Sequence, residues 1–188
     1  MSIKVASDEP IRIDIGCGKN KKPEFIGVDQ YPMEGVDIVM NIADDEWPWE
    51  GSSVSEVNCS HFLEHLTGLE RVRFFNKLHR VLMPGAKALL VVPHWASNRA
   101  YGDFTHQWPP VSEMLFYYIN KTWRESQAPH NDIRWNPEGY CCHFEATWGY
   151  SLHPEILLKN AQAQQFAIQF YKEACQDQVI TLTKLPKE

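Results

Sequence analysis

The sequence predicts an α/β domain built on an open, mostly parallel sheet. A β-branched run at residues 11–15 breaks at a Gly-Cys-Gly turn, and a second apolar run ends at Asp29. A helical pattern of apolar residues over 66–82 stops at Met-Pro-Gly, which is typical of a helix end. The continuous apolar run 86–92 that follows is typical of a buried strand. Strands that alternate with helical patterns in this way indicate an α/β sheet.

Composition limits the class of protein. A chain of 188 residues, 44% hydrophobic and 22% charged, is expected to form one domain over 1–188. The net charge of −6 argues against a surface that binds the phosphates of a nucleic acid. Five cysteines without a regular spacing favour a reducing cytoplasm over a disulfide scaffold, and no segment has the length and apolarity of a membrane span.

The first two strands and their ends indicate a nucleoside-binding sheet. Gly16 and Gly18 allow backbone to approach a ligand, and a carboxylate such as Asp29 at the end of the second strand accepts hydrogen bonds from ribose hydroxyls. The third glycine of the dinucleotide fingerprint is replaced by Lys21, and only six residues separate Gly18 from Phe25. The first crossover helix is therefore expected to be missing or reduced, which favours a ligand without phosphate and argues against a nicotinamide dehydrogenase.

The third and fourth strands are expected at 36–40 and 54–59, each followed by polar residues. In an open parallel sheet the carboxyl ends of the strands carry the ligand, so the segment 60–66 is expected beside the glycine turn. His61 and His65 are four residues apart and would share one face of a helix. They lack an assured third ligand, so no metal site is expected.

The chain from Thr67 onward begins with a capping box, Thr67 to Glu70, at the start of the predicted helix. The irregular stretch 93–110 is the candidate substrate loop, because long loops at the ligand edge of a compact domain are often functional. The remaining pattern predicts a helix over 111–123, a loop over 128–139, an extended segment over 141–152, a helix over 154–174 and a strand over 179–184.

The assembled order resembles the class I S-adenosylmethionine-dependent methyltransferases, most closely the type 11 group. The segments that carry the resemblance are Asp-Ile-Gly-Cys-Gly at 14–18, Val-Asp at 28–29, Asn-Ile at 41–42, Ser-His-Phe-Leu-Glu-His-Leu at 60–66 and Leu-His-Arg-Val-Leu-Met-Pro-Gly at 78–85. The resemblance implies a Rossmann-like open twisted sheet, mostly parallel with an antiparallel C-terminal strand and helices on both faces. It also implies a cofactor-binding half over 1–93 and a substrate-side half over 94–188.

The resemblance further implies where S-adenosylmethionine would bind. Asp14, Gly16 and Gly18 would surround its methionine part, and Asp29 would hold the ribose hydroxyls. The residues implied to contact the cofactor are Asp14, Gly16, Cys17, Gly18, Asp29, Gln30, Asn41, Ile42, Ser60 and His61. An acidic site is compatible with a positively charged sulfur.

The expected activity is methyl transfer by in-line displacement, in which alignment and desolvation matter most. The candidate catalytic residues, should the acceptor need deprotonation, are His94, His106 and His65, with Asp103 orienting one of them. The chain lacks the motifs typical of enzymes that methylate bases, so a small molecule or a protein is the favoured acceptor and a nucleic acid is not. The alternative is a regulator or subunit that binds S-adenosylmethionine without transferring its methyl group.

Overall fold

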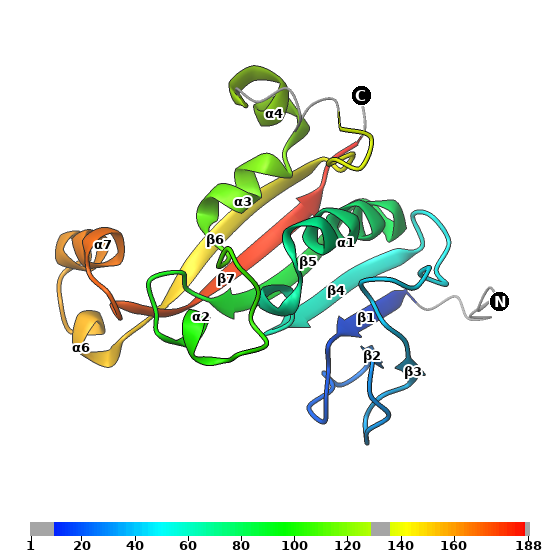
Figure 1. The fold of residues 1–188 in the computed structure, drawn as a ribbon, viewed down its shortest axis with the longest axis horizontal. Coiled ribbons are helices and arrows are strands. Elements are labelled where there is room, and N and C mark those ends of the chain that lie inside the picture. Colours follow the sequence, from blue (N-terminus) through cyan, green and yellow to red (C-terminus); the bar gives the residue numbers. More distant parts are fainter. Residues whose placement is uncertain (1–9, 129–135, 187–188) are drawn as a thin grey trace.

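The computed structural model describes residues 10–128 and 136–186, which form one seven-stranded sheet (Figure 1). The sheet order is β3-β2-β1-β4-β5-β7-β6. The pairs on either side of β1 are parallel, and β7 runs antiparallel between β5 and β6. The strands are β1 (Ile11–Ile15), β2 (Ile26–Asp29), β3 (Ile38–Val39), β4 (Val54–Ser60), β5 (Leu82–Pro93), β6 (Phe144–Leu152) and β7 (Cys175–Lys184). The expected open, mostly parallel sheet with an antiparallel C-terminal strand is confirmed.

Helix α1 (Gly68–Val81) links β4 to β5 and covers the centre of the sheet (Figure 1). It begins at the predicted capping box, in which the backbone N–H of Thr67 donates to Oε2 of Glu70 at 2.7 Å. Phe74, Phe75 and Leu78 on its inner side are fully buried. They join the single apolar cluster that also contains the inner residues of β1, β4, β5 and β7.

The helices that pack on the central strands lie on one face of the sheet. Along β5, Ala88, Leu90 and Val92 are fully buried, whereas Leu89 and Val91 between them are half-buried. Right-handed crossovers place the links β1–β2–β3 on one face and the link β4–β5 on the other. The described links between β1 and β4 contain no helix, so loop residues cover the first face beside β1 and β2. Ile13, Asp14 and Ile15 of β1 are all buried, so both faces of this strand are covered.

The remaining helices are short. They are the 3₁₀ turn η1 (Leu63–His65), α2 (Arg99–Gly102), α3 (Glu113–Tyr118), α4 (Lys121–Gln127), α6 (Pro154–Leu157) and α7 (Ala161–Phe170). The predicted helix 111–123 is divided because Asn120 caps α4 by accepting from the backbone N–H of Trp123 at 3.0 Å. The predicted helix 154–174 is divided in the same way by Asn160, which accepts from Ala163. Of the predicted loop 128–139, residues 129–135 lie outside the described part of the chain.

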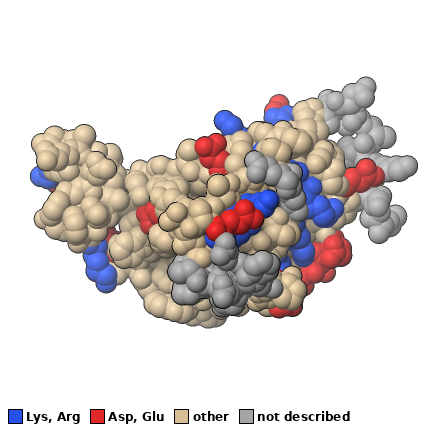
Figure 2. Space-filling view, turned by 90° about the horizontal axis from the view of Figure 1, so that it is seen from above, with Lys and Arg blue, Asp and Glu red and all other residues tan. Residues whose placement is uncertain are grey.

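The α6–α7 pair forms a lobe at one end of the molecule (Figure 1). Figure 2 shows this lobe on the left, with few charged side chains on the visible surface. Its exposed apolar residues are Leu157, Leu158, Phe166, Phe170 and Tyr171. These side chains add little to the core of the domain.

Two further expectations concern the environment of the chain. All five cysteines are free, as their irregular spacing predicts. Every helix in the described ranges is too short or too polar to cross a bilayer.

Candidate functional site

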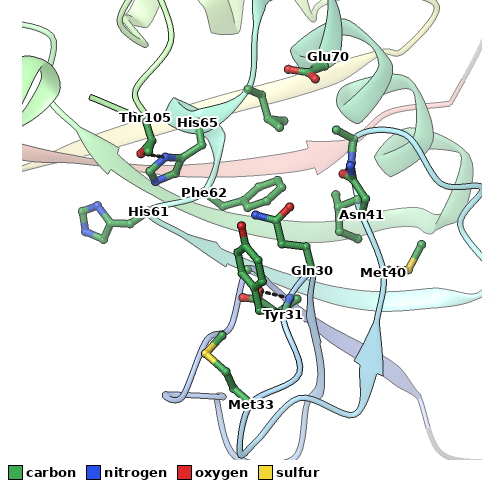
Figure 3. A pocket seen from close by; sticks show the side chains of 15 residues that line it. Gln30, Tyr31, Met33, Met40, Asn41, His61, Phe62, His65, Glu70 and Thr105 are labelled. Atoms are coloured by element: carbon green, nitrogen blue, oxygen red, sulfur yellow. Dashed lines mark hydrogen bonds between the residues drawn. The ribbon is translucent and has the colours of Figure 1, made fainter. Parts of the chain in front are cut away.

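A cavity of about 510 Å³ opens at the carboxyl ends of β1, β2 and β4 (Figure 3). This volume lies within the range of small-molecule sites. The residues that line it are Gly16, Asp29, Gln30, Tyr31, Met33, Met40, Asn41, Ile42, Ala43, His61, Phe62, His65, Leu66, Glu70 and Thr105. Six of the ten residues that the resemblance implies for the cofactor line this cavity, whereas Asp14, Cys17, Gly18 and Ser60 do not.

The glycine turn after β1 needs its first glycine for two reasons. Gly16 has a φ of +65°, and a Cβ built on it would lie 2.8 Å from Cδ2 of Phe62. The N–H groups of Gly16 and Cys17 both donate to the carbonyl of Val28, at 2.8 and 3.3 Å. The N–H of Gly18 donates to Asp29 at 3.0 Å. All three donors of the turn are thus engaged within the protein, and none is free to bind a phosphate.

Asp29 at the end of β2 joins the turn to the next loop. Its Oδ2 accepts from Gly18, and its Oδ1 accepts from the backbone N–H of Tyr31 at 3.1 Å. A carboxylate has about four acceptor positions, so each oxygen retains one for a ligand hydroxyl. The carboxylate is half-buried and lines the cavity.

Asp14 is placed away from the cavity lining. It is only 3% exposed, and it accepts from the backbone N–H of Lys22 and the side chain of Asn58, both at 2.7 Å. It therefore anchors the loop that replaces the first crossover helix. Cys17 is buried nearby, and burial, followed by the charges of Asp14 and Asp29, raises the pKa of its thiol to about 11. The thiol stays protonated in a region of negative potential.

Asn41 and Ile42 follow β3 and line the far side of the cavity from His65 (Figure 3). The Asn41 side chain is already engaged, since its Oδ1 accepts from Ala43 and its Nδ2 donates to Asp44. Hydrogen bonds to groups two and three residues ahead are typical of an Asn in a turn. Ile42 is 3% exposed and offers an apolar wall.

The segment after β4 brings His61 and Phe62 to the cavity, while Ser60 lies outside its lining. His61 has a φ of +53°, and its Nδ1 lies 3.2 Å from Oε1 of Glu64. The hydrogen bond with Glu64 raises the pKa of His61, although partial burial opposes the rise.

Three of the four candidate catalytic residues gather at the rim of the cavity. The rings of His65 and His106 are 4.8 Å apart, centroid to centroid. Oγ1 of Thr105 lies 2.9 Å from Nδ1 of His65 and donates to Asp103 at 2.6 Å. Figure 3 shows His65 and Thr105 side by side at this rim. Sequence reasoning missed Thr105, although it precedes a candidate histidine.

The fourth candidate, His94, lies at a different place. It is 1% exposed, and its Nδ1 accepts from the backbone N–H of Ala96, so Nε2 carries the proton and points to Oε1 of Glu113 at 3.4 Å. Glu113 also accepts from Trp95 and Tyr150, both at 3.0 Å. Burial alone would raise the pKa of Glu113, but its contacts with His94 and Tyr150 hold the pKa below its ordinary value. Trp95, Glu113 and Tyr150 line a second cavity beside α7.

Other lining residues were not among the predicted site residues, although Phe62 and Leu66 belong to the segment 60–66 that was expected beside the glycine turn. They are Tyr31, Met33, Met40, Phe62, Ala43, Leu66 and Glu70. The two methionines and Phe62 have no pattern that separates them from core residues in the sequence. Met33 follows β2, Met40 follows β3 and Phe62 follows β4, so only the fold brings them to the same cavity.

Comparison with known proteins identifies the fold. No family model matches the chain, and no curated protein matches it. Among solved structures, a SAM-dependent methyltransferase from Archaeoglobus fulgidus aligns over 93% of this chain and 86% of its own, with a TM-score of 0.62 and 18% identity.

Two further structures show the same likeness. Geranyl diphosphate C-methyltransferase from Streptomyces coelicolor A3(2), in complex with Mg²⁺, geranyl diphosphate and S-adenosyl-L-homocysteine, aligns over 94% of this chain and 71% of its own, with a TM-score of 0.51 and 13% identity. The 16S rRNA (adenine(1408)-N(1))-methyltransferase from Catenulisporales acidiphilia, with the cosubstrate SAM, aligns over 97% of this chain and 89% of its own, with a TM-score of 0.53 and 13% identity. Some matched chains are much longer, and this chain spans 49% or less of them. The chain has the class I SAM-dependent methyltransferase fold.

Proposed function

We propose that the chain is an S-adenosylmethionine-dependent methyltransferase. We assign residues 1–93 to the cofactor and residues 94–188 to the acceptor side of a single domain. The observation that supports this best is the cavity beside Gly16 and Asp29, at the carboxyl edge of a sheet with the methyltransferase strand order. When bound, the cofactor supplies a methyl group on a positively charged sulfur.

The residues of the cavity fit this cofactor better than a dinucleotide. The N–H groups of residues 16–18 are used within the protein, and the described chain has no helix directly after the turn to receive a pyrophosphate. Asp29 retains acceptor positions for ribose hydroxyls. Ile42 offers an apolar surface for a base, and the negative potential around Cys17 suits a cationic ligand.

The acceptor side begins at His61 and Phe62 and continues to the rim that holds His65 and Thr105. The role of the protein there is to align the acceptor and to exclude water. The net charge of −6 favours a small molecule or a protein as acceptor. The matched structures include enzymes named for geranyl diphosphate and for 16S rRNA, so the fold does not select among acceptor classes.

Calorimetric titration with S-adenosylmethionine and S-adenosylhomocysteine tests the binding step. We expect one site per chain, and an Asp29→Ala variant that binds roughly 10- to 100-fold more weakly, because hydrogen bonds to a charged group contribute about 1.5–3 kcal/mol. The matched control is Glu34→Gln, which removes one exposed carboxylate from the following loop. Binding of NADH without binding of S-adenosylmethionine would refute the proposal.

A second assay separates an enzyme from a protein that only binds the cofactor. The chain is incubated with S-adenosylmethionine and panels of small molecules, proteins or RNA, and release of S-adenosylhomocysteine is measured. Acceptor-dependent release identifies an enzyme and its acceptor class. Tight binding without release in any panel would instead support a regulator or subunit.

A further inference from the structure

A second set of ligand-type side chains lies at the rim of the cavity, on the side of η1. Glu64 and His65 belong to η1, and His106 comes from the loop between α2 and α3. One potential ligand atom from each of these three residues lies within 4.8 Å of the other two. Glu64 and His106 are 42 positions apart in the chain, so only the fold brings the three residues together.

The loop that carries His106 is fastened to η1 on both sides of that residue. Before it, Oγ1 of Thr105 lies 2.9 Å from Nδ1 of His65. After it, the backbone N–H of Gln107 donates to the carbonyl of Glu64 at 2.9 Å. Arg71, 2% exposed, donates to the carbonyl of Gln107 at 3.2 Å. The position of His106 relative to η1 is therefore built into the structure.

The hydrogen bonds of the two histidines engage Nδ1 on each ring, and Nε2 of His106 lies 4.0 Å from Oδ2 of Asp103, beyond hydrogen-bond distance. Thr105 uses its hydroxyl proton to donate to Asp103, so its oxygen accepts from Nδ1 of His65. Nδ1 of His106 lies 3.2 Å from the carbonyl oxygen of Ala100, which only accepts. Both neutral rings then carry a lone pair on Nε2. Metal-binding histidines characteristically donate from their other nitrogen to a carbonyl or a polar side chain in this way.

Glu64 supplies the third group, and one of its carboxylate oxygens lacks a hydrogen-bond partner among the described residues. It is 5% exposed, and Oε1 is 3.2 Å from His61. Oε2 is fully buried and has no hydrogen-bond partner among the described residues. The nearby Arg71 donates instead to the carbonyls of Leu63, Gln107 and Pro109. A buried carboxylate oxygen without a partner costs about 1–3 kcal/mol or more, and a bound cation would remove that cost.

We infer that Glu64, His65 and His106 bind a divalent transition-metal ion of the Zn²⁺ type. Two imidazole nitrogens and one carboxylate oxygen suit Zn²⁺, Co²⁺ or Fe²⁺ better than Mg²⁺ or Ca²⁺, which prefer oxygen ligands. The side chains turn inward on binding, because bonds of about 2.1 Å bring the ligand atoms closer than in the free site. Three protein ligands leave at least one position open, at a rim that His65 shares with the cavity.

The test uses the full chain, stripped of metal with a chelator and titrated with Co²⁺ in the absence of S-adenosylmethionine. We expect one equivalent to bind with the visible absorption of a low-coordinate Co²⁺ site, without the near-ultraviolet bands of a thiolate ligand. This spectrum excludes the five cysteines as the source of binding. Excess Zn²⁺ then displaces Co²⁺. Because no cofactor is present, the result does not depend on the proposed methyl transfer.

Variants assign the ligands. Glu64→Gln and His106→Ala should each weaken Co²⁺ and Zn²⁺ binding by roughly 100-fold or more, and Thr105→Val, which removes the partner of His65, by about 10- to 100-fold. His153→Asn is the matched control, because it removes a histidine at the start of α6 and keeps a side chain that can cap the helix. Circular dichroism and thermal unfolding check that each variant is folded.

Two results would overturn the inference. One is wild-type stoichiometry and affinity in folded His106→Ala or Thr105→Val protein. The other is a wild-type Co²⁺ titration that shows no bound equivalent or a thiolate spectrum. The second result needs no variant, so the inference remains testable even where the Glu64 variant fails to fold. Exposed Thr105 is the substitution least expected to disturb folding.

Discussion

Two glycines in the turn after β1 give a matched pair of substitutions, Gly16→Ala and Gly18→Ala. Both residues have positive φ, +65° and +51°. A Cβ on Gly18 would meet no heavy atom of the described chain within 4 Å. A Cβ on Gly16 would lie 2.8 Å from Cδ2 and 3.0 Å from Cβ of Phe62. The two variants therefore share the backbone strain and differ in the steric clash.

The expected magnitudes follow from these two contributions. A non-glycine residue in left-handed backbone conformation destabilises the protein by about 1–2 kcal/mol, and this applies to both variants. An extra carbon in packed surroundings destabilises the protein by about 1–3 kcal/mol more, and this applies only to Gly16→Ala. For a chain of this size, 1 kcal/mol lowers the melting temperature by about 2–4 °C. Gly16→Ala should thus melt several degrees below Gly18→Ala.

Urea and thermal unfolding of the wild type and both variants measure the difference. The same substitutions are then made in a Phe62→Ala background, which removes Cδ2 and Cγ of the ring. There, about half or more of the additional loss of stability in Gly16→Ala should disappear, and this difference is the coupling energy between residues 16 and 62. Equal destabilisation by the two alanines, or no coupling to Phe62, would show that the turn does not pack against the ring as described.

Three other substitutions test features around the site. Arg71→Met should lower the free energy of unfolding by about 3 kcal/mol or more, because the carbonyls of Leu63, Gln107 and Pro109 lose a charged donor. Limited proteolysis should then cut within residues 103–110. Asp14→Ala should lower the free energy of unfolding by about 2–4 kcal/mol, measured in urea, because two donors lose their shared acceptor. This loss of stability should exceed that of Asp14→Asn. Glu113→Gln should be less stable than the wild type at neutral pH. Burial opposes the charged form of Glu113, but its contacts with His94 and Tyr150 lower its pKa on folding. The stabilising contribution of the carboxylate is therefore present above its ordinary pKa of 4.5 and is lost as the pH falls through the folded-state pKa. Unfolding curves of the wild type and the variant should converge at low pH, and a difference that widens toward acid would contradict this sign.

Local sequence signals predicted two residues that line the cavity at the carboxyl edge of the sheet. Gly16 and Asp29 were found because strand ends in a parallel sheet have recognisable residue types. The capping box at Thr67 fixed the start of α1 for the same reason, since its hydrogen bonds join residues only three positions apart. Features that depend on a few neighbouring residues are readable from the sequence.

Other features depend on contacts that sequence periodicity does not report. Asn120 and Asn160 each begin a new helix within a continuous apolar pattern, so the predicted helices were too long. Asp14 carries the expected motif, yet its side chain holds the loop at Lys22 rather than lining the cavity. The position of His106 depends on hydrogen bonds to η1 from residues about 40 positions away.

The lack of a helix in the described links between β1 and β4 also has a consequence for motion. The short strand β3 pairs with β2 through only two residue pairs, and the adjoining loops are held largely by carboxylates, such as Asp37, which accepts from the backbone N–H of Gly27 at 2.7 Å. Backbone held by few apolar contacts opens at a lower free-energy cost than a packed core. Amide hydrogens of β2 and β3 should therefore exchange with solvent before those of β4, β5 and β7. A ligand in the neighbouring cavity would slow that exchange, and part of its binding energy would be spent on ordering these loops.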